Sequence, residues 1–109
     1  MWNKLNIKAI SLNEAYRGKR FSTKKLKKFK IDIFKLLKPM KITKGKKLSV
    51  TYKFGVSSKS SDGDNLIKVT QDCLAEAYDF NDKIIYQWFV EKHDVAKGKE
   101  YIEFLIVEL

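Results

Sequence analysis

The sequence predicts an α+β fold in which two helices pack on one side of a mixed β-sheet, in the order β-α-β-α-β-β. Two periodicities support this prediction. Apolar and polar residues alternate in some segments, whereas apolar residues recur every three or four positions in others. Glycine, proline and serine separate these segments. Since the chain has 109 residues, we expect residues 1–109 to form a single domain.

The first strand is expected at residues 5–9, where apolar residues alternate with polar ones. Residues 16–22 follow as a basic loop or ribbon, and either Ser22 or Thr23 can cap the next helix. The apolar stripe of that helix consists of Leu26, Phe29, Ile33, Leu36 and Met40. A proline limits this helix near Leu37 because proline cannot continue a helix interior.

The second half of the chain predicts three further strands and one helix. Residues 48–54 alternate as a half-buried strand that ends at Gly55, and a serine-rich loop follows. A helical pattern begins at Asp64, with an apolar face formed by Leu66, Val69, Cys73, Leu74 and Ala77. Residues 84–90 are rich in aromatic and β-branched side chains, and residues 101–107 are nearly all apolar, as in a buried strand.

The charge is distributed unevenly along the chain. Residues 1–60 hold 18 basic and 2 acidic side chains, whereas residues 61–109 hold 5 basic and 11 acidic ones. The whole chain carries a net charge of +10. A basic half suits a polyanion, because each neutralised phosphate releases counterions. We therefore expect a nucleic acid partner, and the alternative is a lysine-rich surface that only solubilises the protein.

Three features that the sequence lacks bear on the location of the protein and on its redox chemistry. No run of about 20 apolar residues is present, so no membrane span and no membrane partner are expected. The N-terminal residues also lack the apolar region of a secretory signal. Cys73 is the only cysteine, which excludes an internal disulfide, and we expect it to pack in the core. These features are typical of a cytoplasmic protein.

A group of acidic residues surrounds one lysine in the second half of the chain. Asp62 and Asp64 lie where the serine-rich loop becomes a helix, and Asp64, Lys68 and Asp72 share one helix face at spacings of four. Asp82 follows at the expected start of the next strand. Clustered carboxylates repel one another, and a divalent cation such as Mg²⁺ relieves that repulsion. Alternatively, Asp62 and Asp64 only cap the helix.

These residues resemble a known sequence pattern. The segments 62–68, 72–74 and 81–82 are similar to the D-x-D-N-x-x-K…D-x-L…D-D pattern of RusA-type Holliday-junction resolvases. The Ser-Leu-Asn of residues 11–13 and the basic residues 17–20 resemble the start of the same family. Asn81 stands where the pattern often has the first Asp of a pair. The resemblance implies a RusA-like endonuclease domain over residues 1–109.

The resemblance also implies residue roles and partners. Asp62, Asp64 and Asp82 would be catalytic ligands of Mg²⁺, for which Mn²⁺ can substitute, and Lys68 would be the catalytic lysine near the scissile phosphate. The supporting residues would be Asp72, Asn65 and Lys92. The substrate would be four-way junction or branched DNA, cut by a homodimer. For DNA binding we select the basic residues Arg17, Lys19, Arg20, Lys24, Lys27 and Lys28.

Two other functions remain open at this point. A non-catalytic DNA-binding or scaffold protein on the same fold would keep the lysines and lose one of the acidic positions, but all are present. A basic RNA-binding module would explain the lysines and leave the acidic cluster without a use. Motifs of other nucleases are missing: no acid has a lysine two positions later, and His93 is the only histidine. We expect His93 in a solvated turn.

Overall fold

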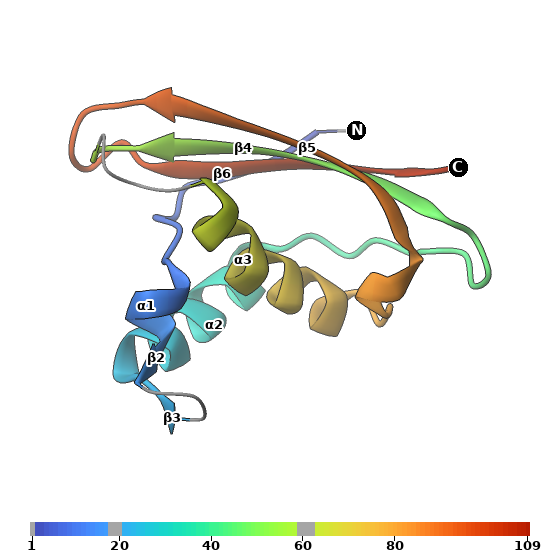
Figure 1. Ribbon diagram of the computed structural model, residues 1–109, viewed down its shortest axis with the longest axis horizontal. Helices are drawn as coiled ribbons and strands as arrows, with labels where there is room; N and C mark the ends of the chain where they lie inside the picture. Colours follow the sequence, from blue (N-terminus) through green and yellow to red (C-terminus); the bar gives the residue numbers. More distant parts are fainter. Residues whose placement is uncertain (1, 18–20, 59–62) are drawn as a thin grey trace.

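A four-stranded sheet forms one layer of the molecule and the helices form the other (Figure 1). The computed structural model describes residues 2–17, 21–58 and 63–109, without the side chains of Phe21 and Asp64. The sheet order is β1-β6-β4-β5, formed by Asn3–Leu5, Tyr101–Glu108, Leu48–Val56 and Ile85–Asp94. β4 runs parallel to β5 and antiparallel to β6, and β1 is antiparallel to β6, so the sheet is mixed.

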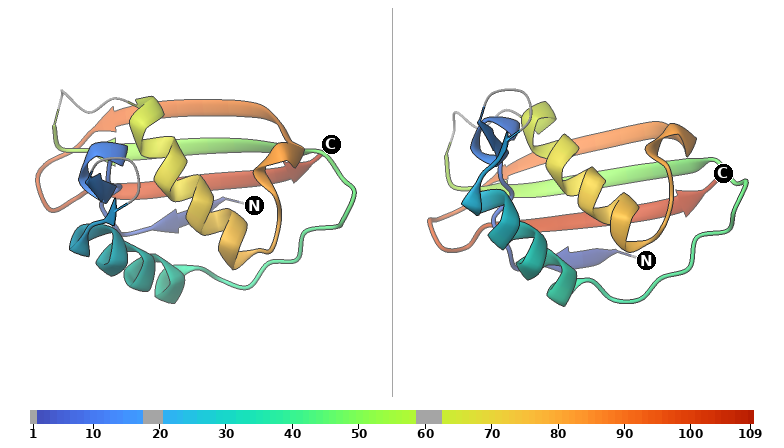
Figure 2. Two further views of the ribbon diagram at one scale, coloured as in Figure 1. Left: turned by 60° about the horizontal axis from the view of Figure 1, so that its bottom comes forward. Right: turned by 90° about the horizontal axis from the view of Figure 1, so that it is seen from below.

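The helical layer contains three α-helices in the described residues: α1 (Leu12–Ala15), α2 (Lys24–Leu36) and α3 (Gly63–Ala77). A short hairpin of β2 (Tyr16–Arg17) and β3 (Phe21–Ser22) connects α1 to α2, and the 3-10 helix η1 (Asp82–Ile84) precedes β5. Figure 2 shows these helices on one face of the sheet, with α3 crossing over from β4 to β5. The opposite face carries no helix in the described part of the chain.

The ends of α2 follow from its flanking residues. Thr23 is extended, and its Oγ1 accepts a hydrogen bond from the backbone N–H of Leu26 at 3.3 Å, as an N-cap does. The helix ends before Leu37, which is extended, and Pro39 follows. Between these ends α2 buries Leu26, Phe29 and Ile33, which confirms the predicted apolar stripe at these positions. Leu36 of the same stripe is 41% exposed, and Met40 lies beyond the end of the helix.

β4 is an inner strand of the sheet, between β6 and β5, and contributes five side chains to the hydrophobic core. Val50 lies opposite Trp88 of β5 and Ile106 of β6 in the two registers. Tyr52 points into the helical layer, where its hydroxyl donates to Gln71 of α3. The largest fully buried side chains come from both the sheet and the helices: Tyr52, Phe54, Phe104, Ile33, Leu48, Leu74, Ile102, Val50, Thr70 and Cys73. Cys73 is therefore a core residue, as predicted.

The α+β class, the mixed sheet and the one-sided helices are confirmed, but several boundaries differ. A third helix, α1, is present because Ser11 and Glu14 form a capping box around it. The first strand spans Asn3–Leu5 and not residues 5–9, because its pairing with β6 stops at Leu5. His93 lies in β5, not in a turn, because the pairing with β4 continues through Asp94.

Candidate active site

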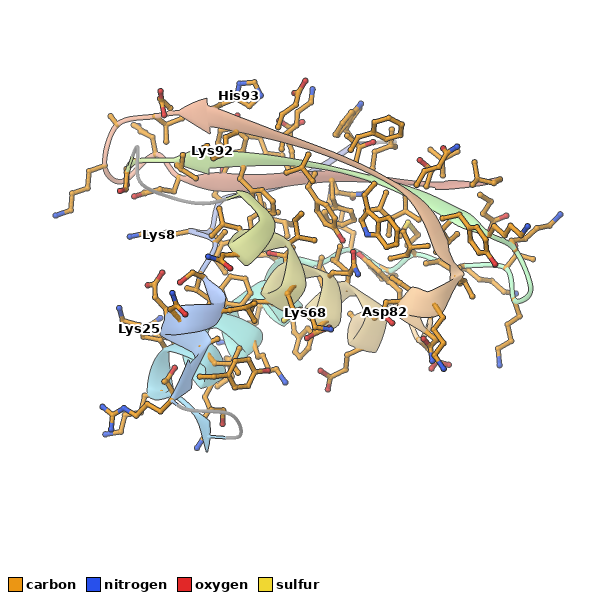
Figure 3. The ribbon with its side chains drawn as sticks, in the orientation of Figure 1. Lys8, Lys25, Lys68, Asp82, Lys92 and His93 are labelled. Atoms are coloured by element: carbon orange, nitrogen blue, oxygen red, sulfur yellow. The ribbon has the colours of Figure 1, made fainter. Side chains whose placement is uncertain are left out.

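Lys68 lies between two carboxylates that come from different elements. Its Nζ is 2.9 Å from Oδ1 of Asp72, one turn later on α3, and 3.7 Å from Oδ2 of Asp82 in η1. The side chains of Lys68, Asp72 and Asp82 are 51%, 41% and 41% exposed. Figure 3 shows Lys68 and Asp82 on the helical side of the sheet. The cluster is therefore accessible to a ligand in solution.

The turn after α3 places Asp82 beside that helix. Asp79 adopts a left-handed conformation with φ 54°, which an aspartate tolerates better than most residues. Oδ1 of Asn81 then accepts the backbone N–H of Lys83 at 2.9 Å and caps η1. The reversal brings Asp82 back toward α3, and η1 leads directly into β5, so Asp82 lies just before that strand.

The charge of Lys68 is stabilised by its neighbours. The pKa of Lys68 is raised, and the largest cause is the hydrogen bond that Lys68 donates to Asp72. Partial burial lowers this pKa, but the negative charges of Asp72 and Asp82 raise it further, so the net shift is upward. Because the pKa is raised, Lys68 is protonated at neutral pH. It can therefore contribute a positive charge to a reaction and cannot serve as a general base there.

A buried hydrogen-bond network fixes the part of α3 that carries this cluster. Gln71 is 6% exposed, and its Oε1 accepts from the Tyr52 hydroxyl at 3.1 Å and from Nε1 of Trp88 at 2.8 Å. Burial and the charge of Asp72 both raise the pKa of Tyr52, so its hydroxyl remains a donor. Sequence reasoning missed Gln71, and its only signal was a polar residue beside Asp72.

The remaining predicted site residues are placed less completely. Asp62 lies outside the described residues, whereas the backbone of Asp64 lies in α3 one turn before Lys68. Lys92 pairs with Phe54 in the sheet, near the end of β5 that is distant from Asp82 (Figure 3). Among the side chains that the structure describes, no three His, Cys, Asp or Glu residues come together as a metal site.

Part of the predicted DNA-binding surface lies in the helical layer. Arg17 is exposed on β2, and Lys24, Lys27 and Lys28 are exposed on α2. Lys28 forms a 2.8 Å ion pair with Asp32, and Lys25 and Lys30 of the same helix pair with Glu14 and Glu76, so part of the positive charge of α2 is compensated. Lys19 and Arg20 fall outside the described residues. The described basic residues and the Lys68 cluster lie on the same side of the sheet (Figure 1).

Comparison with known proteins identifies the family. Within the described ranges, no helix is both long and apolar enough to cross a membrane. A search of the curated proteins found no match. The family model described as endodeoxyribonuclease RusA matches residues 5–104, which contain α1 to η1 and the whole Lys68 cluster. The chain therefore belongs to the RusA family of endodeoxyribonucleases.

Proposed function

We propose that this protein is a Mg²⁺-dependent endonuclease that resolves four-way junctions and other branched DNA by paired phosphodiester nicks. The observation that carries the proposal is the protonated Lys68 held between Asp72 and Asp82 in a chain of an endodeoxyribonuclease family. The basic residues on the same side of the sheet supply affinity for phosphates.

The proposed ligands of the metal are Asp62, Asp64 and Asp82. Carboxylate oxygens are the ligands that Mg²⁺ and Mn²⁺ take in proteins, and Asp82 is already close to a cation, since it lies 3.7 Å from the Lys68 amine. The backbone position of Asp64, one turn before Lys68, is compatible with the same site. When bound, the metal supplies an activated water and neutralises charge on the phosphate.

Lys68 is proposed to neutralise the charge that develops on the scissile phosphate. The pair between Lys68 and Asp72 spans i and i+4 on a half-exposed face, so it stabilises the helix by only about 0.3–0.5 kcal/mol. The amine can therefore exchange a carboxylate for a phosphate oxygen at little cost. Asp72 keeps the side chain oriented in the absence of DNA, which makes it a positioning residue.

DNA binding is proposed to use the exposed lysines of α2 and the basic residues around the hairpin. Affinity should fall with salt, with a log–log slope of about −0.9 for each phosphate contact on duplex arms. Charge reversal at Lys24, Lys27 and Lys28 should weaken binding to every DNA shape alike. The control is the same reversal at Lys41, Lys44 and Lys46, in the loop before β4. If both triple substitutions weakened binding equally, α2 would not be part of the DNA-binding surface.

We also propose that the active form is a homodimer. A four-way junction has approximate two-fold symmetry, and one acidic cluster can make one nick, so a C₂ dimer supplies the second. The helix-free sheet face and the β5 edge support this proposal because Trp88 is 48%, Phe89 55% and Val107 45% exposed. Sedimentation at micromolar concentration tests it: a 12.8 kDa monomer with full activity would exclude the dimer.

The main experiment is a cleavage assay on four-way junction, duplex and single-stranded DNA with Mg²⁺, Mn²⁺ or a chelator. We expect metal-dependent cutting of the junction, and Asp64→Asn and Asp82→Asn should each abolish it and retain binding. Asp79→Asn is the matched control, since it removes the same charge in the adjacent turn, where asparagine tolerates a positive φ. Metal-independent binding without any cleavage would favour the non-catalytic alternative.

A further inference from the structure

A recess of about 300 Å³ opens beside the first turn of α3. Its walls come from four segments that are distant in the sequence: Lys8 and Asn13 near α1, Gly55 at the end of β4, Asn65 of α3, and Glu100 before β6. Small-molecule pockets occupy roughly 300–1,000 Å³, so the recess can hold one planar base but not a duplex.

The position of the recess relates it to the proposed chemistry. It lies at the carboxyl end of β4, where the chain crosses over through α3 to the parallel strand β5, and such ends commonly bind ligands. Asn65 follows Asp64 directly, and Lys68 comes three residues later, a rise of about 4.5 Å along the helix.

The charges of the recess favour a base over a phosphate in its interior. Glu14 accepts hydrogen bonds from the backbone and hydroxyl of Ser11 at 3.3 Å, and Glu100 accepts one from Ser57 at 2.6 Å. Both carboxylates line the recess and would repel a phosphate. Lys8 contributes a cation from the exposed segment between the sheet and α1 (Figure 3).

We propose that this recess receives one unstacked DNA base next to the cut phosphate, an inference that rests on the proposed nuclease function. The amide of Asn13 is exposed at the recess and offers both donors and an acceptor, so it can hydrogen-bond to a base edge and discriminate between bases. Lys8 contacts the phosphate of the same nucleotide, and such a contact carries no sequence information. Bases at a branch point are less stacked, which lowers the cost of extrusion.

The first test compares junctions that differ only in the bases flanking the cut. The wild type should prefer one base at one flanking position by about 10-fold or more in rate, and Asn13→Ala should remove that preference. Lys8→Ala should weaken binding to all these junctions alike and reduce the salt slope by about one contact. Asn6→Ala and Lys44→Ala are matched controls, because both residues are exposed and lie outside the recess. Equal rates for all flanking bases, or an unchanged preference in Asn13→Ala, would overturn the proposal.

A second test does not depend on cleavage. Junctions with 2-aminopurine at each flanking position should gain fluorescence on binding without metal, because the analogue brightens when it leaves the base stack. Asn13→Ala, which removes the amide without adding a charge, should reduce this gain while the protein melts as the wild type does. If fluorescence increased at none of the flanking positions, an extruded base would be excluded. An increase in fluorescence without cleavage of the junction would count only against the nuclease function.

Discussion

Replacement of Lys68 separates a structural role of this side chain from a catalytic one. Lys68→Ala removes an exposed i,i+4 pair worth about 0.3–0.5 kcal/mol and a weaker contact at 3.7 Å with Asp82. For a domain of this size, such a loss lowers Tm by about 1–2 °C. If the amine instead stabilises charge in the transition state, its removal slows cleavage by on the order of 100- to 1,000-fold.

The assay measures single-turnover cleavage of a four-way junction with saturating Mg²⁺, together with thermal melting of the same samples. Lys83→Ala is the control, because it removes an equal charge from η1 beside the cluster. Lys68→Arg should retain part of the rate because it keeps the charge with a different geometry. Near-normal turnover of Lys68→Ala, or a rate lost only in proportion to stability, would refute the catalytic role.

Three further predictions concern the core that supports the site. Gly55→Ala should destabilise the fold by about 1–3 kcal/mol in urea melts, since an added Cβ overlaps the Tyr101 ring; unchanged stability would mean that the ring moves away freely. Thr70→Val should raise stability by about 1 kcal/mol, because the Thr70 hydroxyl is buried with no partner among the described residues, and a loss would point to a bonded hydroxyl. Burial raises the pKa of Cys73 to about 11, whereas an unfolded thiol titrates near about 8.5, so the unfolded state releases the proton first. Stability should therefore fall as pH rises from about 8.5 to 11, by up to about 1.4 kcal/mol per pH unit, and Cys73→Ala should show a flatter decline.

The elements in which the hydrophobic pattern repeats several times could be predicted from the sequence. The stripe of α2 and the alternation of β4 repeat several times, so packing and pattern agree there. α1 has only four residues, which is too short for any periodicity to appear. The last residues of β5 are polar because this edge strand is exposed on both faces, so alternation gave no reason to extend it to His93.

The site could be predicted in part for similar reasons. The pairing of Lys68 with Asp72 follows from helical spacing alone, and their proximity to Asp82 follows the family pattern. Gln71 was not predictable, because one polar residue on a helix gives no sign that its amide accepts two buried donors. The recess was also not predictable, since its walls come together only when four distant segments fold.

The pairing of β1 with β6 has a consequence for the order in which the molecule forms during translation. Residues 3–5 cannot find their partners until residues 102–104 have left the ribosome. The lysine-rich half emerges first, while β4 still lacks both of its neighbours in the sheet. A nascent chain would therefore attract polyanions before Asp82 has been brought to Lys68. The four-stranded sheet can therefore close only after nearly all of its residues have been synthesised.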